Sequence, residues 1–500
     1  MHESTKSNYD VIIVGSGAGG GTLAYALSLE KKTVLVIERG DFIPKEKANR
    51  SSQGVSGKKY RTTTNIEFNG VLHNSYSHYY VGGATKLYGA ALYRFRREDF
   101  TERQHYEGVS PSWPISYDDL EPYYSQAEQI YKVHGSITED PTEPFHSQNY
   151  PFKPIEHETF IRPLTKKMER AGINVSYIPK AIDYSETGTC EFCQNCDGYA
   201  CELGAKLDTE QACLQPAISS GYVDILTNAE CTLINTNQSG NKVTSVKVTI
   251  GGLVKELSAP IYVISCGILD STALLLRSAN NKHPNGLANS SGLVGRYLSG
   301  HNTGVFLLPT FKKVPEIHQK TFAVNDFYHG GKASKYPLGI LQASGRLAIW
   351  LEVEKWLQPI TKFIVQRSII TFIMSEVIPK YENRVGLTKD GQVSIQYETN
   401  NIKSFRKLRM VFMRMFWRIG IFGAFCARHP IGGLPWHAVG TLRFGKDPEQ
   451  SVLDEYCRTH DVDNLYVVDA SFMPSAGSVN MTLTIMAQAL RVAKQIAGRL

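Results

Sequence analysis

Two sets of residues near opposite ends of the chain have types and spacings that suit chemistry on a bound dinucleotide. Gly15, Gly17 and Gly20 fit the pattern Gly-x-Gly-x-x-Gly, in which the backbone comes close to a pyrophosphate. Near the other end, His437 lies in a Gly-rich stretch that we expect to be a turn, and Asn480 opens the last predicted helix. An imidazole can remove a proton at cellular pH. The sequence therefore predicts one active site built from both ends of the chain.

The glycine pattern lies inside a predicted strand–helix–strand unit, and this context makes the pattern specific. The strand, the helix and the second strand are expected at residues 9–14, 22–29 and 33–37. Gly15 would permit the tight turn, Gly17 the close approach of the pyrophosphate, and Gly20 the packing of helix on strand. Glu38 ends the second strand, where its carboxylate would accept hydrogen bonds from a ribose 2′-hydroxyl and repel a 2′-phosphate. The unit argues against NADP and does not separate FAD from NAD.

Four cysteines lie close together in the middle of the chain. Cys190, Cys193, Cys196 and Cys201 follow the pattern C-x2-C-x2-C-x4-C. The spacing is close to the bacterial ferredoxin run, but its last step is one residue longer and no proline follows. Three interpretations stay open at this point: an iron–sulfur cluster, a zinc ion, or free or redox-linked thiols.

Composition places the chain among ordinary globular proteins. Its 500 residues are enough for two domains, and hydrophobic and charged contents of 42% and 20% are typical of soluble proteins. A net charge of +7 is mild for this length and does not favour a nucleic-acid partner. We recognise no signal peptide, and no apolar run is long enough to span a bilayer. We therefore expect a cytoplasmic protein with no transmembrane segment.

Residues 403–418 place basic side chains at helical spacing with apolar ones between them. The favoured interpretation is a packed helix with a solvated basic face. Contact with a membrane surface is the alternative.

Five segments, taken in order, resemble the glucose–methanol–choline (GMC) oxidoreductase family along nearly the whole chain. They are YDVIIVGSGAGGG, YVGGATKLYGAALYRF, SWPISYDDLEPYY, NSSGLVGRYLSGH, and HAVGTLRFGKDP with NLYVVDASFMPSAGSVNMTLTIMA. The resemblance implies FAD as the cofactor and oxidation of an alcohol by hydride transfer to the flavin. It also implies an α/β fold, with a Rossmann-like FAD-binding domain and a discontinuous, sheet-based substrate-binding domain.

The same resemblance divides the chain into interleaved segments. The FAD-binding domain is expected to comprise residues 8–105, 190–302 and 437–500. The substrate-binding domain is expected to comprise residues 106–189 and 303–436. Sites of this kind lie between domains, at the carboxyl ends of the parallel strands.

Four residues match stretches that contact the flavin in the family. Gly82 and Gly83 match the Gly-rich stretch beside the isoalloxazine ring, and Asp469 and Ala470 match a second flavin-binding stretch. The resemblance thus adds these four to the glycines and the glutamate of the strand–helix–strand unit as cofactor-binding residues.

Two further residues match the family's catalytic positions. His437 matches the catalytic histidine, a general base, and Asn480 matches a second position that is His or Asn in the family. Met481 follows Asn480 where the family often has proline, a departure in detail. The other histidines, His301 among them, have no comparable support and are interpreted as structural or surface residues.

The substrate is expected to be a small alcohol. Some similar family members oxidise a primary hydroxyl of a sugar or of an aminoglycoside antibiotic intermediate, so a sugar, polyol or aminoglycoside-type alcohol is the first hypothesis. Oxidation of a sterol or long-chain alcohol, a hydroxynitrile-lyase-type reaction on the same fold, and an NAD-dependent dehydrogenase are the alternatives. The electron acceptor, whether oxygen, a quinone or a redox protein, is left open.

Overall fold

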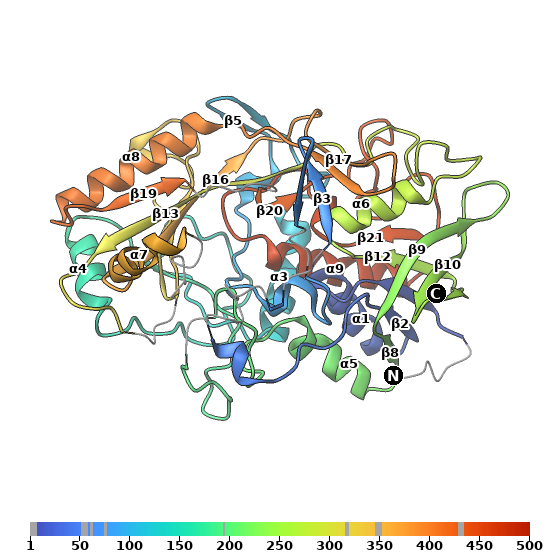
Figure 1. Cartoon of the computed structure of the whole chain (residues 1–500), viewed down its shortest axis with the longest axis horizontal. Coiled ribbons are helices and arrows are strands. Elements are labelled where there is room, and N and C mark those ends of the chain that lie inside the picture. The colour runs from blue at the N-terminus through green and yellow to red at the C-terminus, as the bar shows by residue number, and fades with distance from the viewer. Residues whose placement is uncertain are drawn as a thin grey trace.

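The computed structural model describes residues 8–51, 59–60, 64–74, 78–193, 196–315, 320–345, 353–428 and 435–500. Within these residues the strands form a five-stranded parallel sheet, a seven-stranded sheet and three smaller ones (Figure 1). The two large sheets lie toward opposite ends of the molecule. The predicted active-site residues come from the loops and strand ends between them.

The parallel sheet is the Rossmann-like part that the sequence predicts. Its strands, in spatial order, are β21 (Leu465–Val467), β12 (Ile261–Ile264), β1 (Val11–Val14), β2 (Val34–Ile37) and β8 (Val223–Leu226). Four of the five read as short, almost continuous aliphatic runs, as strands covered on both faces do. The expected strand–helix–strand unit is confirmed, with α1 (Ala18–Leu29) as its helix. On one side of the sheet, α1 packs against the C-terminal helix α9 (Thr482–Ala497).

The seven-stranded sheet is antiparallel. Its strands are β19 (Phe425–Arg428), β13 (Ser299–Pro309), β16 (Ser368–Val377), β15 (Ile340–Ala343), β14 (Phe322–Val324) and β7 (Ser176–Tyr177), with β20 (Trp436–Val439) paired to β13. Side chains alternate along β13. Phe306 and Leu308 join the core under α8 (Ile402–Arg418), whereas Val305 and Leu307 face the cluster at the end of α7 (Gln358–Val365). The predicted basic helix is therefore confirmed as a packed helix.

The smaller sheets complete the framework. They comprise β9 (Ala229–Thr236), β10 (Val243–Ile250) and β11 (Leu253–Leu257); β3 (Asn65–Phe68), β4 (Val71–Asn74), β17 (Arg384–Leu387) and β18 (Val393–Gln396); and β5 (Arg103–His105) with β6 (Gly108–Ser110). The four-stranded sheet pairs β3 with β18, although the sequence assigned these two strands to different domains. Strand β20 pairs with β13 in the seven-stranded sheet, although residues from 437 onward were assigned to the FAD-binding domain. The domain boundaries therefore stay a prediction.

The remaining helices are short. They are α3 (Tyr117–Ile130), α4 (Arg162–Arg170), the π-helix η4 (Glu210–Leu214), α5 (Gln215–Ser219), α6 (Ile268–Arg277) and the 3-10 turns η1 (Lys47–Arg50), η2 (Gly83–Lys86), η3 (Arg97–Phe100), η5 (Gly331–Ala333), η7 (Lys355–Leu357) and η8 (Ala470–Phe472). Helix α3 begins after Ser116, whose hydroxyl accepts from the backbone N–H of Asp119 in a capping box. None of the helices in the described ranges is long and apolar enough to cross a membrane.

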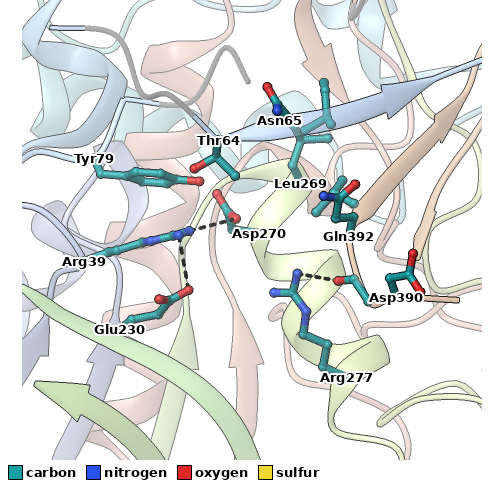
Figure 2. A pocket seen from close by; sticks show the side chains of 13 residues that line it. Arg39, Thr64, Asn65, Tyr79, Glu230, Leu269, Asp270, Arg277, Asp390 and Gln392 are labelled. Carbon is teal, nitrogen blue, oxygen red and sulfur yellow. Dashed lines mark hydrogen bonds and ion pairs between the residues drawn. The ribbon is translucent and has the colours of Figure 1, made fainter. Parts of the chain in front are cut away.

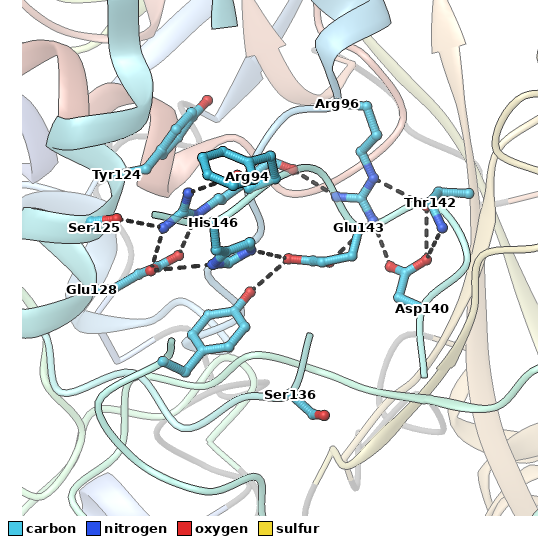
Figure 3. A network of polar contacts seen from close by, with 12 residues as sticks. Arg94, Arg96, Tyr124, Ser125, Glu128, Ser136, Asp140, Thr142, Glu143 and His146 are labelled. Carbon is cyan, nitrogen blue, oxygen red and sulfur yellow. Dashed lines mark hydrogen bonds and ion pairs between the residues drawn. The ribbon is translucent and has the colours of Figure 1, made fainter. Parts of the chain in front are cut away.

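Two fully buried arginines fix the segment that follows η2 (Figure 3). Arg94 contacts Glu121 at 2.9 Å and Glu128 at 2.7 Å, both on α3, and Arg96 contacts Asp140 at 2.6 Å. Removing one partner of such a buried pair costs about 3–5 kcal/mol. The network therefore holds the chain beyond the predicted flavin glycines in one position against α3.

Candidate active site

The Gly-rich turn between β1 and α1 leaves no room for side chains at two of its predicted positions. Gly15 has φ +98°, and a Cβ there would lie 2.3 Å from the carbonyl oxygen of Ser265. A Cβ at Gly20 would lie 2.0 Å from the Gly15 carbonyl oxygen and 3.1 Å from Ile13 of β1. Glycine at the first position thus permits the turn, and glycine at the second lets helix and strand pack.

Gly17 differs because the space beside it is open. A Cβ there would meet only one atom of the described chain within 4 Å, the Cα of Gly83 at 3.9 Å. Gly17 caps the 12-residue helix α1 without a side-chain hydrogen bond, so the first backbone N–H groups of α1 point at this space. An open cradle between two glycine loops at a helix N-terminus fits a pyrophosphate.

Glu38 stands at the end of β2 as predicted, and its carboxylate is already held by the chain. One oxygen accepts from the backbone N–H and the hydroxyl of Ser16, at 3.1 and 2.5 Å, and the other accepts from the N–H of Gly40 at 3.0 Å. Burial raises the pKa of Glu38 above its ordinary value despite these hydrogen bonds. The hydroxyl of Ser16 also accepts from the N–H of Gly82 at 3.1 Å, so Ser16 ties the Gly-rich turn to η2.

An open cleft continues from the end of β2 (Figure 2). Arg39, the residue after Glu38, lies over the ring of Tyr79 at 4.1 Å and forms ion pairs with Glu230 at 3.4 Å and Asp270 at 3.9 Å. Because β2 and β12 lie on either side of β1, this cleft lies near the point where strand order reverses. The cleft lies apart from the predicted catalytic pair, since neither His437 nor Asn480 lines it.

Asp469, at the carboxyl end of β21, connects the start of α6 to η8. Its carboxylate accepts from the N–H of Gly267 at 3.0 Å and from the hydroxyl of Ser271 at 2.5 Å, both at the start of α6. It also accepts from the N–H of Ser471 at 2.9 Å and thereby caps η8. The carbonyl of Ala470 accepts from the N–H of Gly440 at 3.3 Å, which links this loop to the segment that carries the candidate base.

His437 lies in strand β20 rather than in the expected turn. Pairing with β13 makes the segment a strand, although His437 itself has a left-handed φ of +51°. A non-glycine residue in that region is uncommon and is a feature of many active sites. The close approach depends on Gly300 of β13, where a Cβ would lie 2.6 Å from the Trp436 carbonyl oxygen and 3.0 Å from that of His437.

The structure brings His437 next to Asn480, as predicted, and also next to His301, which the sequence analysis interpreted as a structural or surface residue. The Nδ1 atoms of His437 and His301 are 3.0 Å apart, and Nδ2 of Asn480 is 3.3 Å from Nε2 of His437. His301 lies in the fourth of the family-like segments, so that resemblance was the available signal. His437 and Asn480 both keep part of their surface accessible, whereas His301 is buried.

The hydrogen-bond partners of His301 assign the tautomer of His437. Nε2 of His301 lies 3.3 and 3.1 Å from the carbonyl oxygens of Ala476 and Gly477, which can only accept, so this nitrogen carries the proton. Nδ1 of a neutral His301 is then an acceptor, and Nδ1–H of His437 must be the donor. Glu376 holds the two carbonyls in place by accepting from the N–H groups of the same residues at 3.2 Å. The lone pair of His437 therefore lies on Nε2, the nitrogen that faces Asn480.

The amide of Asn480 is oriented in the same way by Gln342 of β15. Nε2–H of Gln342 donates to Oδ1 of Asn480 at 2.7 Å, which turns the NH₂ group of Asn480 toward His437. No local sequence signal marks Gln342, because its role depends on a sheet contact 138 residues away.

His437 is a neutral base in this surrounding. Burial, and after it the neighbouring His301 and Lys320, lower the pKa of His437 well below its ordinary value. Lys320 lies 3.6 Å from Asp197, and the carboxylate of Asp197 opposes this lowering. Because Nε2 of His437 is unprotonated at neutral pH, it can accept a proton from a hydroxyl placed beside Asn480.

Within the described residues, none of the four clustered cysteines forms a disulfide bond. In the part of the chain that the structure describes, no three His, Cys, Asp or Glu side chains are gathered as a metal site. Burial raises the pKa of Cys196 to about 11, while Lys180 and Lys206 oppose that effect.

The comparisons with known proteins agree with one another. Two sequence models described as GMC oxidoreductase match residues 9–303 and 430–489. The 6‴-hydroxyparomomycin C oxidase of Streptomyces lividus is 29% identical over 98% of this chain and 92% of that protein. The paromamine 6′-oxidase of Streptomyces fradiae is 28% identical over 98% of this chain and 92% of that protein. The structure of pyridoxine 4-oxidase from Mesorbium loti superposes with a TM-score of 0.69 at 20% identity, over 98% of this chain and 99% of the other.

Proposed function

Since the chain belongs to the GMC oxidoreductase family, whose members use FAD to oxidise CH–OH groups, we propose that it oxidises a primary hydroxyl of a sugar, polyol or aminoglycoside-type alcohol to the carbonyl. His437 is the general base, and Asn480 holds the substrate oxygen. The observation that carries the proposal is the lone pair of neutral His437 beside the amide of Asn480. We also propose the cytoplasm as the location, as the sequence predicts.

The residues that would hold FAD come from the ends of β1, β2 and β21 and from the turn η2. They are Gly15, Gly17, Gly20, Glu38, Gly82, Gly83, Asp469 and Ala470. The open cradle beside Gly17 and the N-terminus of α1 suit the pyrophosphate. The bound flavin supplies a hydride acceptor, and the protein supplies orientation and proton transfer.

The proton step follows from the assigned tautomer. The substrate O–H bond breaks as its proton moves to Nε2 of His437, while the C–H bond gives up a hydride and the C=O bond forms. The imidazolium that results keeps Nδ1–H on His301, which remains its acceptor. Asn480, whose amide direction is set by Gln342, donates to the substrate oxygen as negative charge grows there.

Polar groups near the base favour a hydroxyl-rich substrate. Gln342, Lys320 and Asp197 all lie near His437 or Asn480. A sugar or polyol could form hydrogen bonds with such groups, whereas a long aliphatic chain could not. The two Streptomyces relatives named above carry aminoglycoside names, which supports the same class.

A metal centre at Cys190, Cys193, Cys196 and Cys201 is a separate hypothesis within this proposal. It is supported by Lys180, a buried ammonium near Cys196 with no hydrogen-bond partner among the described residues, which would favour a bound thiolate. About one equivalent of cluster or zinc per chain is expected if the hypothesis holds. Fully active, metal-free protein would exclude it.

His301 should act as a positioning residue for the base. In His301→Leu, Nδ1–H of His437 loses its acceptor, and a hydrogen bond to a charged group contributes about 1.5–3 kcal/mol. The limiting rate of flavin reduction should therefore fall by about 10- to 100-fold, with little change in substrate affinity. His301→Asn keeps an acceptor near the Nδ1 position and should recover part of the rate. Stopped-flow reduction over a range of substrate concentrations separates the two quantities.

The pH profile of the same reaction distinguishes this role from a structural one. Because the pKa of His437 is lowered, the base form persists as pH falls, and the acid-side decline of the wild-type rate should lie below about pH 6.5. The decline should shift in His301→Leu, because Nδ1–H of His437 loses the acceptor that stabilises its charged form. An unchanged rate and profile in His301→Leu would refute the positioning role.

A further inference from the structure

Six aromatic side chains are exposed at the end of the molecule that is built from the second sheet. They are Phe311, Trp356, Phe363, Trp417, Phe422 and Phe425, which we call the aromatic end. Trp356 and Phe422 expose 74% and 75% of their surface, and Phe311 is fully exposed. Scattered exposed apolar residues are ordinary, but a gathered set marks an interaction surface.

Hydrogen bonds and strand register place these residues on one end. The loop that carries Phe311 lies along the end of α7, with the N–H of Thr310 donating to the carbonyl of Arg367 at 2.7 Å. Phe425 of β19 is paired in register with Leu307, near the end of β13. Figure 1 shows α7, α4, β19 and one end of α8 together at the left, far from the parallel sheet.

Helix α7 has its apolar side turned outward. Ile360, Phe363 and Ile364, spaced three and four residues apart, form one exposed face, while Val365 alone is buried against the sheet. A surface helix of a globular protein normally shows the reverse pattern. This outward apolar face needs a partner other than the sheet beneath it.

The charges around the aromatic end are mostly positive. The basic side chains on the same segments are Lys312, Lys355, Lys362, Arg367, Arg414 and Arg418. Among the described residues of 353–375 and 402–428, Glu354 has the only carboxylate side chain. The guanidinium of Arg367 lies over the ring of Phe363 at 3.9 Å, so cationic and aromatic groups share one surface.

We propose that the aromatic end docks the protein on an anionic lipid surface. Aromatic rings settle at the level of the headgroups, and binding strength grows with buried apolar area and with attraction of basic side chains to anionic lipid. The protein lies on the surface rather than spanning it, with α7 along the plane of the headgroups. Because lipids are fluid, the headgroup layer can surround aromatic side chains that project separately from different loops and helices.

The basic side chains of the aromatic end favour an anionic lipid surface over a second copy of the chain as the binding partner. Two aromatic ends brought together would place their basic groups against each other with almost no carboxylates between them. Repulsion would therefore oppose a symmetric dimer through this face. The inference stands independently of the substrate, because the residues involved contact neither His437 nor the predicted cofactor site.

Vesicle co-sedimentation of the full-length, FAD-loaded protein tests the proposal. We expect binding to vesicles of phosphatidylcholine with phosphatidylglycerol, much weaker binding to phosphatidylcholine alone, and loss of binding at high salt. Charge reversal by Lys362→Glu, Arg414→Glu and Arg418→Glu should weaken binding about a hundredfold or more. Replacing Phe311, Phe363 and Phe422 together with serine should weaken it at least about tenfold. Flavin reduction by a soluble alcohol should not change in either variant.

Leu253 and Val254 of β11 provide a matched control. Both are more than half exposed, at 70% and 64%, and lie on a different sheet. Leu253→Ser with Val254→Ser should bind anionic vesicles as the wild type does. The proposal is overturned if wild-type protein ignores anionic vesicles, if it binds both kinds of vesicle equally, or if the three serine substitutions instead abolish a dimer seen by size-exclusion chromatography.

Discussion

Replacing His437 with alanine should slow anaerobic flavin reduction by about 10²- to 10⁴-fold, the usual contribution of a general base. The reason lies in the assigned tautomer, which leaves Nε2 of His437, beside Asn480, as its unprotonated nitrogen. FAD content should stay unchanged, because His437 is not among the residues expected to hold the cofactor. Single-turnover reduction by stopped flow, with a flavin-to-protein ratio measured on the same sample, gives both quantities.

The backbone at this position requires a second variant. His437 has φ +51°, a conformation that asparagine tolerates better than most residues. His437→Asn therefore preserves the strand while removing the base, and it should be as slow as His437→Ala. His460, which bonds to Ser451 at 2.9 Å, supplies the control, and His460→Asn should react like the wild type. Rapid reduction in both His437 variants would show that another group takes the proton.

Replacing Gly17 with valine should yield a folded protein without FAD. The space beside Gly17 is open, since a Cβ at this position would have only the Cα of Gly83 within 4 Å, so the fold should tolerate the side chain. The valine would, however, occupy the space where the pyrophosphate must approach the N-terminus of α1. Far-UV circular dichroism should match that of the wild type, while the flavin absorbance should be absent and should not return on adding FAD.

Variants at two further glycines distinguish loss of the cofactor from misfolding. A Cβ at Gly19 would lie 1.6 Å from the carbonyl oxygen of Val468, so Gly19→Ala should lose the fold itself. Gly386 of β17 has room for a side chain, and its nearest neighbour to a Cβ is 3.4 Å away, so Gly386→Val should keep both fold and FAD. A yellow, fully loaded Gly17→Val protein would refute the predicted nucleotide site.

The parts of the site that depend on local sequence could be predicted. The strand–helix–strand unit with Gly15, Gly17 and Gly20 needs only the order of a few adjacent residues, and the structure shows that unit where the pattern put it. Helix α9 likewise begins two residues after Asn480. Local periodicity and turn chemistry carry enough information for such elements.

The parts of the site that depend on contacts between distant residues could not be predicted from the sequence. His437 looked like a turn residue because its neighbours are glycine-rich, but pairing with β13 makes the segment a strand. The contact from His301 to His437 spans 136 residues and that from Gln342 to Asn480 spans 138, so neither leaves a local pattern. The resemblance named the catalytic pair but not the residues that orient it.

The most direct test of the central claim is an anaerobic spectrum of the purified protein during titration with sugars, polyols, aminoglycosides and simple alcohols. We expect an oxidised-flavin spectrum that bleaches with a hydroxyl-rich substrate, in step with formation of one carbonyl per flavin. A flavin that no alcohol reduces, in a protein that instead cleaves a cyanohydrin, would contradict alcohol oxidation and establish the lyase chemistry. A colourless protein that cannot be reconstituted with FAD would contradict the cofactor site itself.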